Sequence, residues 1–176
     1  MHTFQPYPID MLNMNPFTKI GKEWALISAG DKNKCNTMTV SWGGVGVLWG
    51  KNVVYIFIRD SRYTKEFIDG SDTFSLSFFD SDDVKIRESL SYLGSVSGRN
   101  ENKIKNANMK VNFYVDDEKC ETPFIDEARM VLVCKKMFAQ KLTKDSFINP
   151  DIDEKWYKDG DYHTLYIGEI QHMLAR

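Results

Sequence analysis

The sequence has no long hydrophobic run, no cluster of basic residues and few cysteines. Its apolar stretches fall short of the roughly 18 residues that a membrane-spanning helix needs, so we expect no membrane span. The first residues lack a basic leader, an apolar core and a lipidation signal, which predicts a cytoplasmic protein. The formal net charge is −2, with lysine and arginine spread along the chain. Because a nucleic-acid binder needs a dense basic surface, we expect no nucleic-acid partner.

The cysteines and histidines form neither a metal-binding nor a redox pattern. Cys35, Cys120 and Cys134 are widely spaced, and no CxxC pair occurs. We expect three reduced thiols, which is the usual state of cysteine in the cytoplasm. The histidines do not form HExxH or another ligand cluster. The sequence therefore predicts no metal held by the protein.

What is present is a strand-rich pattern. Residues 73–79 alternate most clearly, with apolar side chains on one side and Ser75 and Ser77 on the other. Alternation of this kind predicts one buried face and one wetter face, as in antiparallel sheets. Five other segments also have strand composition: residues 24–29, 36–42, 52–58, 128–142 and 163–174.

Two helices are expected between these strands. The first begins after a cap at Asp60 or Ser61 and ends near Gly70. The second begins at residues 81–83 and ends at Gly94. Three of its apolar residues should face the core: Val84, Leu90 and Leu93. Strands with helical crossovers in a chain of 176 residues predict a mainly β fold, a β-barrel, in a single domain spanning residues 1–176.

Residues 59–67 (RDSRYTKEF) follow the strongest strand and open a helix. Free amide groups at a helix start, guanidinium groups and hydroxyls together suit a phosphate. A single helix end suits a terminal phosphate better than a pyrophosphate. The same residues could instead form a solvated helix cap with surface arginines. The candidate phosphate ligands are Arg59, Ser61, Arg62, Tyr63 and Thr64.

Residues 35–50 combine a strand rich in small hydroxyls with Trp42 and a run of glycines. Hydroxyls and exposed backbone could bind a planar heterocycle while Trp42 packs nearby. The alternative is a plain strand and a loose hairpin. The segment nearly spells GxGxxG, but Trp49 interrupts the motif and a strand follows it, which excludes a dinucleotide-binding Rossmann fold.

Two later segments are also candidates. Ser97, Gly98 and Arg99 form a polar turn after the second helix, and Arg99 could add charge to a phosphate or a nicotinamide dinucleotide. The turn could equally be a plain helix end. His163 enters an apolar strand, where it could position a cofactor or substrate at neutral pH, or be an edge residue that solvent satisfies.

Together these segments resemble the flavin reductase-like family of FMN-binding split barrels, and its flavoredoxin branch most. The matching stretches NTMTVSW, RDSRYTKEFI, YLGSVSGR and DYHTLYIGEI occur in the family's order within residues 24–170. The resemblance implies a split β-barrel and a homodimer with FMN near the subunit interface. In many relatives an aspartate directly precedes the histidine, whereas Tyr162 here separates Asp161 from His163.

The resemblance also implies residue roles. Along the flavin ring and ribityl chain it places Asn36, Met38, Thr39, Val40, Ser41 and Trp42. It implies that the candidate phosphate ligands of residues 59–67 bind the FMN phosphate. It also places Ser97, Gly98 and Arg99 in a turn near the flavin. It places His163 near the nicotinamide or the flavin edge, as the one catalytic candidate.

The implied activity is that of an NAD(P)H:flavin oxidoreductase, with FMN as cofactor and NADH or NADPH as co-substrate. Hydride would pass from the nicotinamide to flavin N5, and the flavin supplies this chemistry. Two alternatives stay open. The protein could be a flavoredoxin-type electron carrier whose bound FMN is reduced by a partner protein. It could also be a non-redox binding module on the same barrel.

Overall fold

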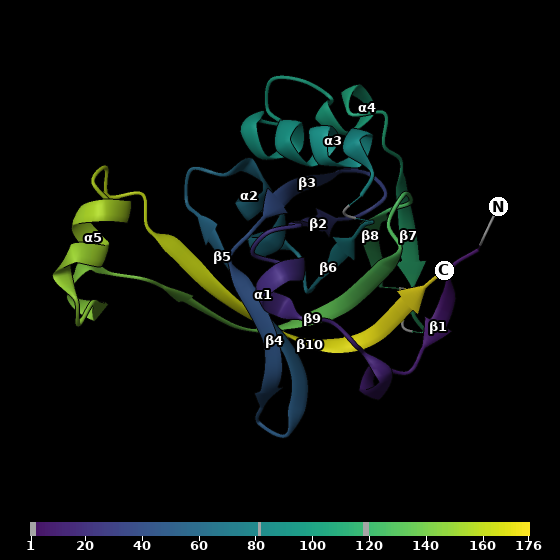
Figure 1. The fold of residues 1–176 in the computed structure, drawn as a ribbon, viewed down its shortest axis with the longest axis horizontal. Coiled ribbons are helices and arrows are strands. Elements are labelled where there is room, and N and C mark those ends of the chain that lie inside the picture. The colour runs from purple at the N-terminus through teal and green to yellow at the C-terminus, as the bar shows by residue number, and fades with distance from the viewer. Residues whose placement is uncertain (1–2, 81, 118–119) are drawn as a thin grey trace.

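The protein is described by a computed structural model that covers residues 3–80, 82–117 and 120–176. Its main sheet has eight antiparallel strands: β1 Gln5–Tyr7, β2 Ala25–Gly30, β3 Cys35–Val40, β4 Gly43–Leu48, β5 Lys51–Arg59, β6 Thr73–Phe78, β9 Met130–Lys141 and β10 His163–Ala175. The order is β3-β2-β6-β9-β10-β5-β4, with β1 added to β10 (Figure 1). Only Ser41 and Trp42 join β3 to β4, so the sheet curls until its two edges approach each other.

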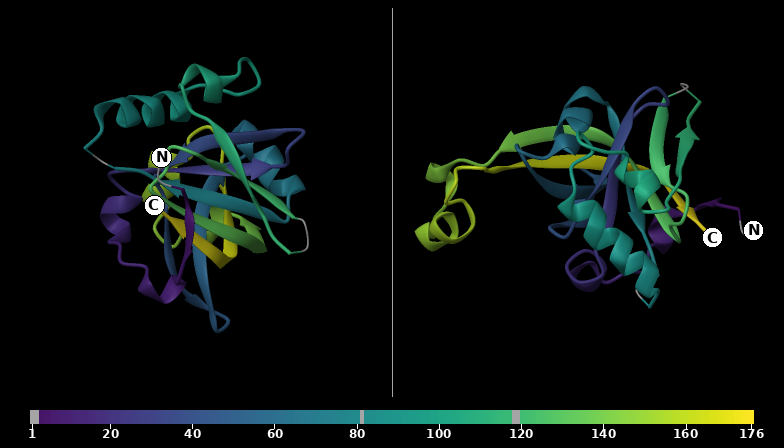
Figure 2. Two further views of the ribbon diagram at one scale, coloured as in Figure 1. Left: turned by 90° about the vertical axis from the view of Figure 1, so that its right-hand side faces the viewer. Right: turned by 90° about the horizontal axis from the view of Figure 1, so that it is seen from above.

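Apolar side chains pack on both faces of the curled sheet. Successive residues of a strand point to opposite faces, and β2 shows this: Ile27 faces the inner cluster and Leu26 the outer one. Helices α3 (Val84–Ser95) and α4 (Lys103–Asn106), with the hairpin of β7 (Val111–Val115) and β8 (Glu121–Ile125), cover the outer face (Figures 1 and 2). The inner cluster is therefore the barrel interior.

Strand β6 corrects one prediction. Ser75 and Ser77 are fully buried rather than on a wetter face. The Ser75 hydroxyl donates to the carbonyl of Pro123, and the Ser77 hydroxyl accepts from the amide of Ile125. These small polar side chains let β8 lie close over the sheet while their hydroxyls stay hydrogen-bonded.

The helix ends differ in detail from the predictions. Helix α2 (Tyr63–Gly70) ends as predicted, but its N-cap is Arg62, so the prediction of a cap at Asp60 or Ser61 is wrong. Both of those side chains bind other groups instead.

Helix α3 begins after Asp83, whose carboxylate accepts from two helix amides as expected of an N-cap. It ends at Ser95, one residue beyond the predicted Gly94. Leu90 and Leu93 are buried as predicted, whereas Val84 is 67% exposed. Residue 81, which the prediction placed at the helix start, lies outside the described residues.

The far ends of β9 and β10 extend beyond the rest of the sheet and carry the β9–β10 connection, residues 142–162 (Figures 1 and 2). This connection contains the short helices η2 (Lys144–Ser146) and α5 (Pro150–Trp156). Two more short helices, η1 (Ile9–Met11) and α1 (Pro16–Lys19), precede β2. The sequence predictions missed several short elements: β1, η1, α1, β7, β8, η2 and α5.

The cysteines are as expected, since Cys35, Cys120 and Cys134 are free thiols. In the described part of the chain, no group of three or more acidic, cysteine or histidine side chains could hold a metal. No helix within the described ranges is long and apolar enough to cross a membrane.

Candidate functional site

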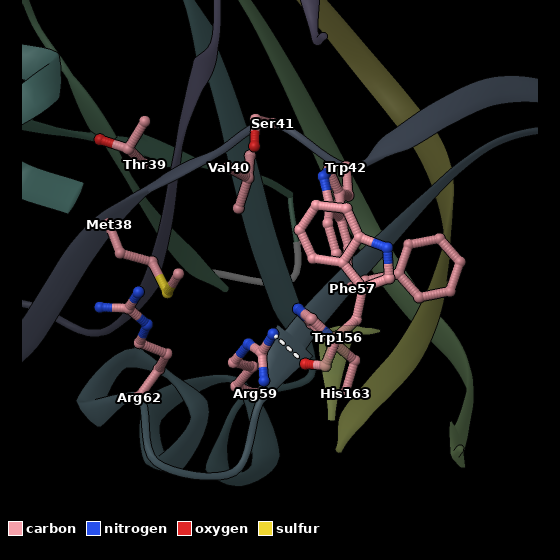
Figure 3. Close-up of a pocket in the computed structure, with 10 residues that line it drawn as sticks. All are labelled: Met38, Thr39, Val40, Ser41, Trp42, Phe57, Arg59, Arg62, Trp156 and His163. Carbon is pink, nitrogen blue, oxygen red and sulfur yellow. Dashed lines mark hydrogen bonds between the residues drawn. The ribbon is translucent and has the colours of Figure 1, made fainter. Parts of the chain in front are cut away.

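A cavity of about 320 Å³ opens where β3, β5 and β10 meet the β9–β10 connection. Its wall combines the end of β3, the two residues after it, and side chains from distant segments (Figure 3). We call it the ring cavity, and it is lined by Met38, Thr39, Val40, Ser41, Trp42, Phe57, Arg59, Arg62, Trp156 and His163.

One side of the ring cavity is aromatic. The Trp42 and Trp156 rings meet edge to face at 5.1 Å between centroids, and the Trp42 ring lies 4.9 Å from the His163 ring. Phe57 completes this side, while Met38 and Arg62 lie opposite (Figure 3). Apolar walls with a few polar groups are the usual lining of a site for a flat organic ring.

His163 is a buried part of this wall, only 7% exposed, so the alternative of a solvent-satisfied edge residue is wrong. Its Nδ1 lies 2.8 Å from the Tyr157 hydroxyl. Burial and the positive charge of Arg59 lower the pKa of His163 from 6.5 to about 4. The imidazole is therefore neutral near pH 7.

Arg59 fastens the β9–β10 connection to the end of β5. Its guanidinium donates to the carbonyls of Asp161 (2.8 Å) and Trp156 (2.9 Å), and the second bond is drawn in Figure 3. The Asp161 carboxylate in turn accepts from the Ser61 amide (3.1 Å) and hydroxyl (2.6 Å). These bonds hold Trp156 at the cavity.

A second, smaller cavity of about 110 Å³ adjoins the first, since Met38 and Arg62 line both. It lies between the start of α2 and the end of α3, and hydroxyl groups dominate its polar lining. We call it the polar cavity, and it is lined by Met38, Ser61, Arg62, Tyr63, Thr64, Leu93, Ser95, Val96, Ser97 and Lys103.

Lys103 gives the polar cavity a buried cation. It is 4% exposed, and its ammonium donates to the carbonyls of Leu93 (2.9 Å) and Val96 (3.0 Å) at the end of α3. Arg62 donates to Gly94 at the same helix end (3.1 Å). The negative pole of a helix C-terminus favours such cations. Burial, with a smaller effect of Arg62, lowers the pKa of Lys103 from 10.5 to about 8.

The two cations have no acidic partner, because neither Lys103 nor Arg62 forms an ion pair with a carboxylate of the described residues. An ammonium has three N–H donors, and two of those of Lys103 are used by carbonyls. Buried charges are normally paired. The polar cavity can therefore accept an anion between these groups.

Most of the predicted site residues line one of the two cavities, but three line neither. Asn36 is buried behind the site and donates to the Thr64 hydroxyl (2.9 Å). Gly98 passes so close to Asn36 that a Cβ atom there would lie 2.4 Å from its side-chain oxygen. Arg99 pairs with Glu66 outside the cavities. These three residues support the lining rather than form it.

Six lining residues are not among the predicted site residues: Leu93, Ser95 and Val96 around the end of α3, and the more distant Phe57, Trp156 and Lys103. Phe57 lies in the most strand-like segment, where an aromatic residue reads as core. Trp156 belongs to the connection between β9 and β10, and only the tertiary fold brings it to Trp42. Lys103 begins a four-residue helix in a polar segment. Its place four residues after Arg99 of the predicted polar turn is a local signal that could have marked it.

The curled sheet with its helical crossovers is the mainly β split barrel that the sequence predicts. The chain belongs to the flavin reductase like domain family, which it matches over residues 17–176. No curated protein matches the sequence.

Solved structures of low sequence identity share the fold. A flavoredoxin from Methanosarcina acetivorans has a TM-score of 0.62 at 22% identity, over 87% of this chain and 68% of that one. The FMN-binding domain of a flavin reductases-like enzyme from Shewanella baltica has a TM-score of 0.67 at 17% identity, over 98% and 77%. An NADH:FAD oxidoreductase from Streptomyces globisporus, solved with NAD and FAD fragments, has a TM-score of 0.58 at 14% identity, over 87% and 74%.

Proposed function

We propose that the protein binds one FMN across the two cavities and oxidises NADH or NADPH with it. The flavin ring would occupy the ring cavity and its terminal phosphate the polar cavity. The observation that carries this proposal is the adjacency of the two spaces, which share Met38 and Arg62. One space suits a flat ring and the other suits an anion.

The residues fit the phosphate of FMN. Lys103 and Arg62 provide positive charge that no acidic residue of the described chain neutralises, and hydroxyls of Thr64 and Ser97 line the same cavity. Charge-assisted hydrogen bonds from such groups are the strong contacts of phosphate sites. The small volume, about 110 Å³, suits a terminal phosphate better than a pyrophosphate.

The residues also fit the flavin ring. Trp42, Phe57 and Trp156 give apolar walls, and Ser41 and the backbone beyond β3 give polar contacts along one side. When bound, FMN supplies hydride chemistry at N5. The protein's own part is to hold the ring between these walls and to keep the guanidinium groups of Arg59 and Arg62 beside it.

A homodimer is part of the same proposal. Large apolar side chains are exposed on the β4–β5 hairpin, β9 and the β9–β10 connection: Val47, Leu48, Trp49, Tyr55, Phe138 and Ile148. Exposed apolar side chains that form a patch commonly mark an interface. Light scattering at low micromolar concentration should give twice the chain mass, and Trp49→Asp should reduce it. The single-domain organisation and the cytoplasmic location stay predictions.

The test is an absorption spectrum of the purified protein, followed by anaerobic addition of NADH and then NADPH. We expect flavin bands that bleach with one of the nucleotides. Bands that persist with both would overturn the oxidoreductase proposal.

The second candidate, an electron carrier, is supported by the shared fold of two flavoredoxins. It requires fast reduction of the same bands by a low-potential donor protein.

The protein could instead be colourless, with a melting temperature that does not rise when FMN is added. That result would favour the remaining alternative, a non-redox binding module. A ligand at a hundredfold excess over its Kd stabilises the native state by about 2.7 kcal/mol, which a thermal melt can measure.

A further inference from the structure

Tyr157 follows α5 in the β9–β10 connection and reaches back to the site. Its side chain is 6% exposed, and its hydroxyl lies 2.8 Å from Nδ1 of His163. Within the described residues this hydroxyl has no other hydrogen-bond partner. A buried phenol proton needs an acceptor, because leaving it unsatisfied costs free energy. Nδ1 is the acceptor within reach, so the Tyr157 hydroxyl donates to it.

The state of the imidazole follows from this bond. A neutral ring carries one proton, and a nitrogen that accepts a hydrogen bond cannot hold it. The proton of His163 is then on Nε2. No described residue bonds to Nε2, and His163 lines the ring cavity.

We propose that Tyr157 is a positioning residue that holds His163 in one tautomer, so that the imidazole presents a fixed Nε2–H donor to the ring cavity.

The charged groups around His163 support a neutral ring. Arg59 of β5 and Arg62 before α2 disfavour the imidazolium, and the Asp161 carboxylate favours it. Burial is the largest effect and acts with the two arginines, so the pKa stays near 4. Trp42 and Phe57 pack against the ring and limit its rotation. Near pH 7, His163 therefore offers the ring cavity a hydrogen-bond donor at Nε2 and does not act as a base there.

The donor restricts what can lie against it, and this step rests on the proposed function. Nε2–H requires an acceptor such as a carbonyl oxygen. Two carbonyl sources are compatible with the ring cavity: the carboxamide of a nicotinamide, and a carbonyl of the flavin ring itself. A cationic or purely hydrogen-donating group would be excluded from this position.

The first measurement is the nitrogen-15 spectrum of the histidines in the ligand-free protein, with His163 assigned from its loss in His163→Asn. We expect Nε2 to be protonated and Nδ1 unprotonated, unchanged from about pH 8 to about pH 7. A cationic ring, or a proton on Nδ1, would overturn the proposal. This result does not depend on FMN or NADH, so it stands apart from the fate of the proposed function.

Tyr157→Phe tests the role of the hydroxyl. Without this donor, a second tautomer that carries the proton on Nδ1 should appear. The matched control is Tyr162→Phe, which removes a hydroxyl of the same connection that bonds to Asp153 instead. The control should keep the wild-type spectrum. An unchanged spectrum in Tyr157→Phe would contradict a positioning role.

Ligand binding identifies the carbonyl. If the nicotinamide carboxamide is the acceptor, Tyr157→Phe should raise KM for the nucleotide about threefold to tenfold and leave kcat and FMN affinity near wild type. If a flavin carbonyl is the acceptor, Kd for FMN should rise by the same factor. No change in either constant would overturn the assignment of a carbonyl acceptor, whereas absence of any nucleotide oxidation would count against the proposed function alone.

Discussion

The ring cavity and the polar cavity share two residues but are built in different ways. The polar cavity is formed by two helix ends, with Lys103 and Arg62 bonded to carbonyls at the end of α3. The ring cavity depends on Trp156 and on the bonds through which Arg59 and Ser61 hold the β9–β10 connection. Under the proposed function, affinity for the phosphate depends on these two cations, whereas affinity for the ring depends on the bonds that hold the β9–β10 connection. Variants should separate the two.

The largest difference is expected for Lys103→Met. Hydrogen bonds to charged groups contribute about 1.5–3 kcal/mol, so FMN should bind roughly 10- to 100-fold more weakly. Riboflavin has no phosphate, and its affinity should change less than about twofold. Titration calorimetry with both ligands measures the pair. Lys105→Met, at an exposed position of the same short helix, is the control and should bind FMN like wild type. Equal losses for FMN and riboflavin would show that Lys103 does not bind the phosphate.

The next effect is the pH dependence of that binding. Lys103 in the folded protein loses its proton near pH 8 rather than near 10.5, while the phosphate is already a dianion at pH 7. FMN affinity of the apoprotein should therefore fall by up to roughly tenfold between about pH 7 and about pH 9. Riboflavin should show no such fall. In Lys103→Met the slope should vanish, and a slope that persists would assign it to another group.

Arg59→Ala tests the other side of the comparison. The sequence alone predicts Arg59 as a phosphate ligand, but the structure places it in the ring cavity, bonded to the carbonyls of Trp156 and Asp161. Its loss should loosen the β9–β10 connection and weaken FMN and riboflavin alike, by about threefold to tenfold. The same titrations measure it. If only FMN affinity falls, and riboflavin affinity does not, Arg59 is a phosphate ligand as the sequence predicts.

The last prediction concerns stability rather than binding. The pKa of His163 is about 4 in the folded protein against an ordinary 6.5, so on acidification the unfolded chain takes up this proton first. The contribution of His163 to stability is complete above about pH 6.5 and is lost as the pH falls toward 4. Urea unfolding at several pH values should show a shallower decline in His163→Gln than in wild type. His172→Gln is the control, and an equal change in both would contradict the assignment.

The parts of the structure that the sequence predicts are those with local causes. Alternation in β6 and the dense runs of β5 and β10 are read directly, and Asp83 marks the start of α3 because a carboxylate caps helix amides. The residues at the start of α2 that line the polar cavity are picked out because they open a helix directly after a strand. The buried serines of β6 were misread, because periodicity does not show that β8 covers the second face.

The rest of the site depends on tertiary contacts. Trp156 reaches Trp42 only because β9 and β10 run side by side and carry the connection to the end of β5. Lys103 matters only because α4 folds back against the end of α3. Neither relation has a signature in the spacing of residues. For this part of the site, the sequence offers only its resemblance to a family. The resemblance identifies the segments that contain site residues, but not their division between two cavities.

A crystal structure of the protein with FMN tests the central claim most directly. The expected result is a phosphate in the polar cavity, within hydrogen-bond distance of Lys103 Nζ and Arg62, and a flavin ring between Met38 and the aromatic wall. A phosphate bound to Arg59, or exposed to solvent while the polar cavity holds only water, would contradict it.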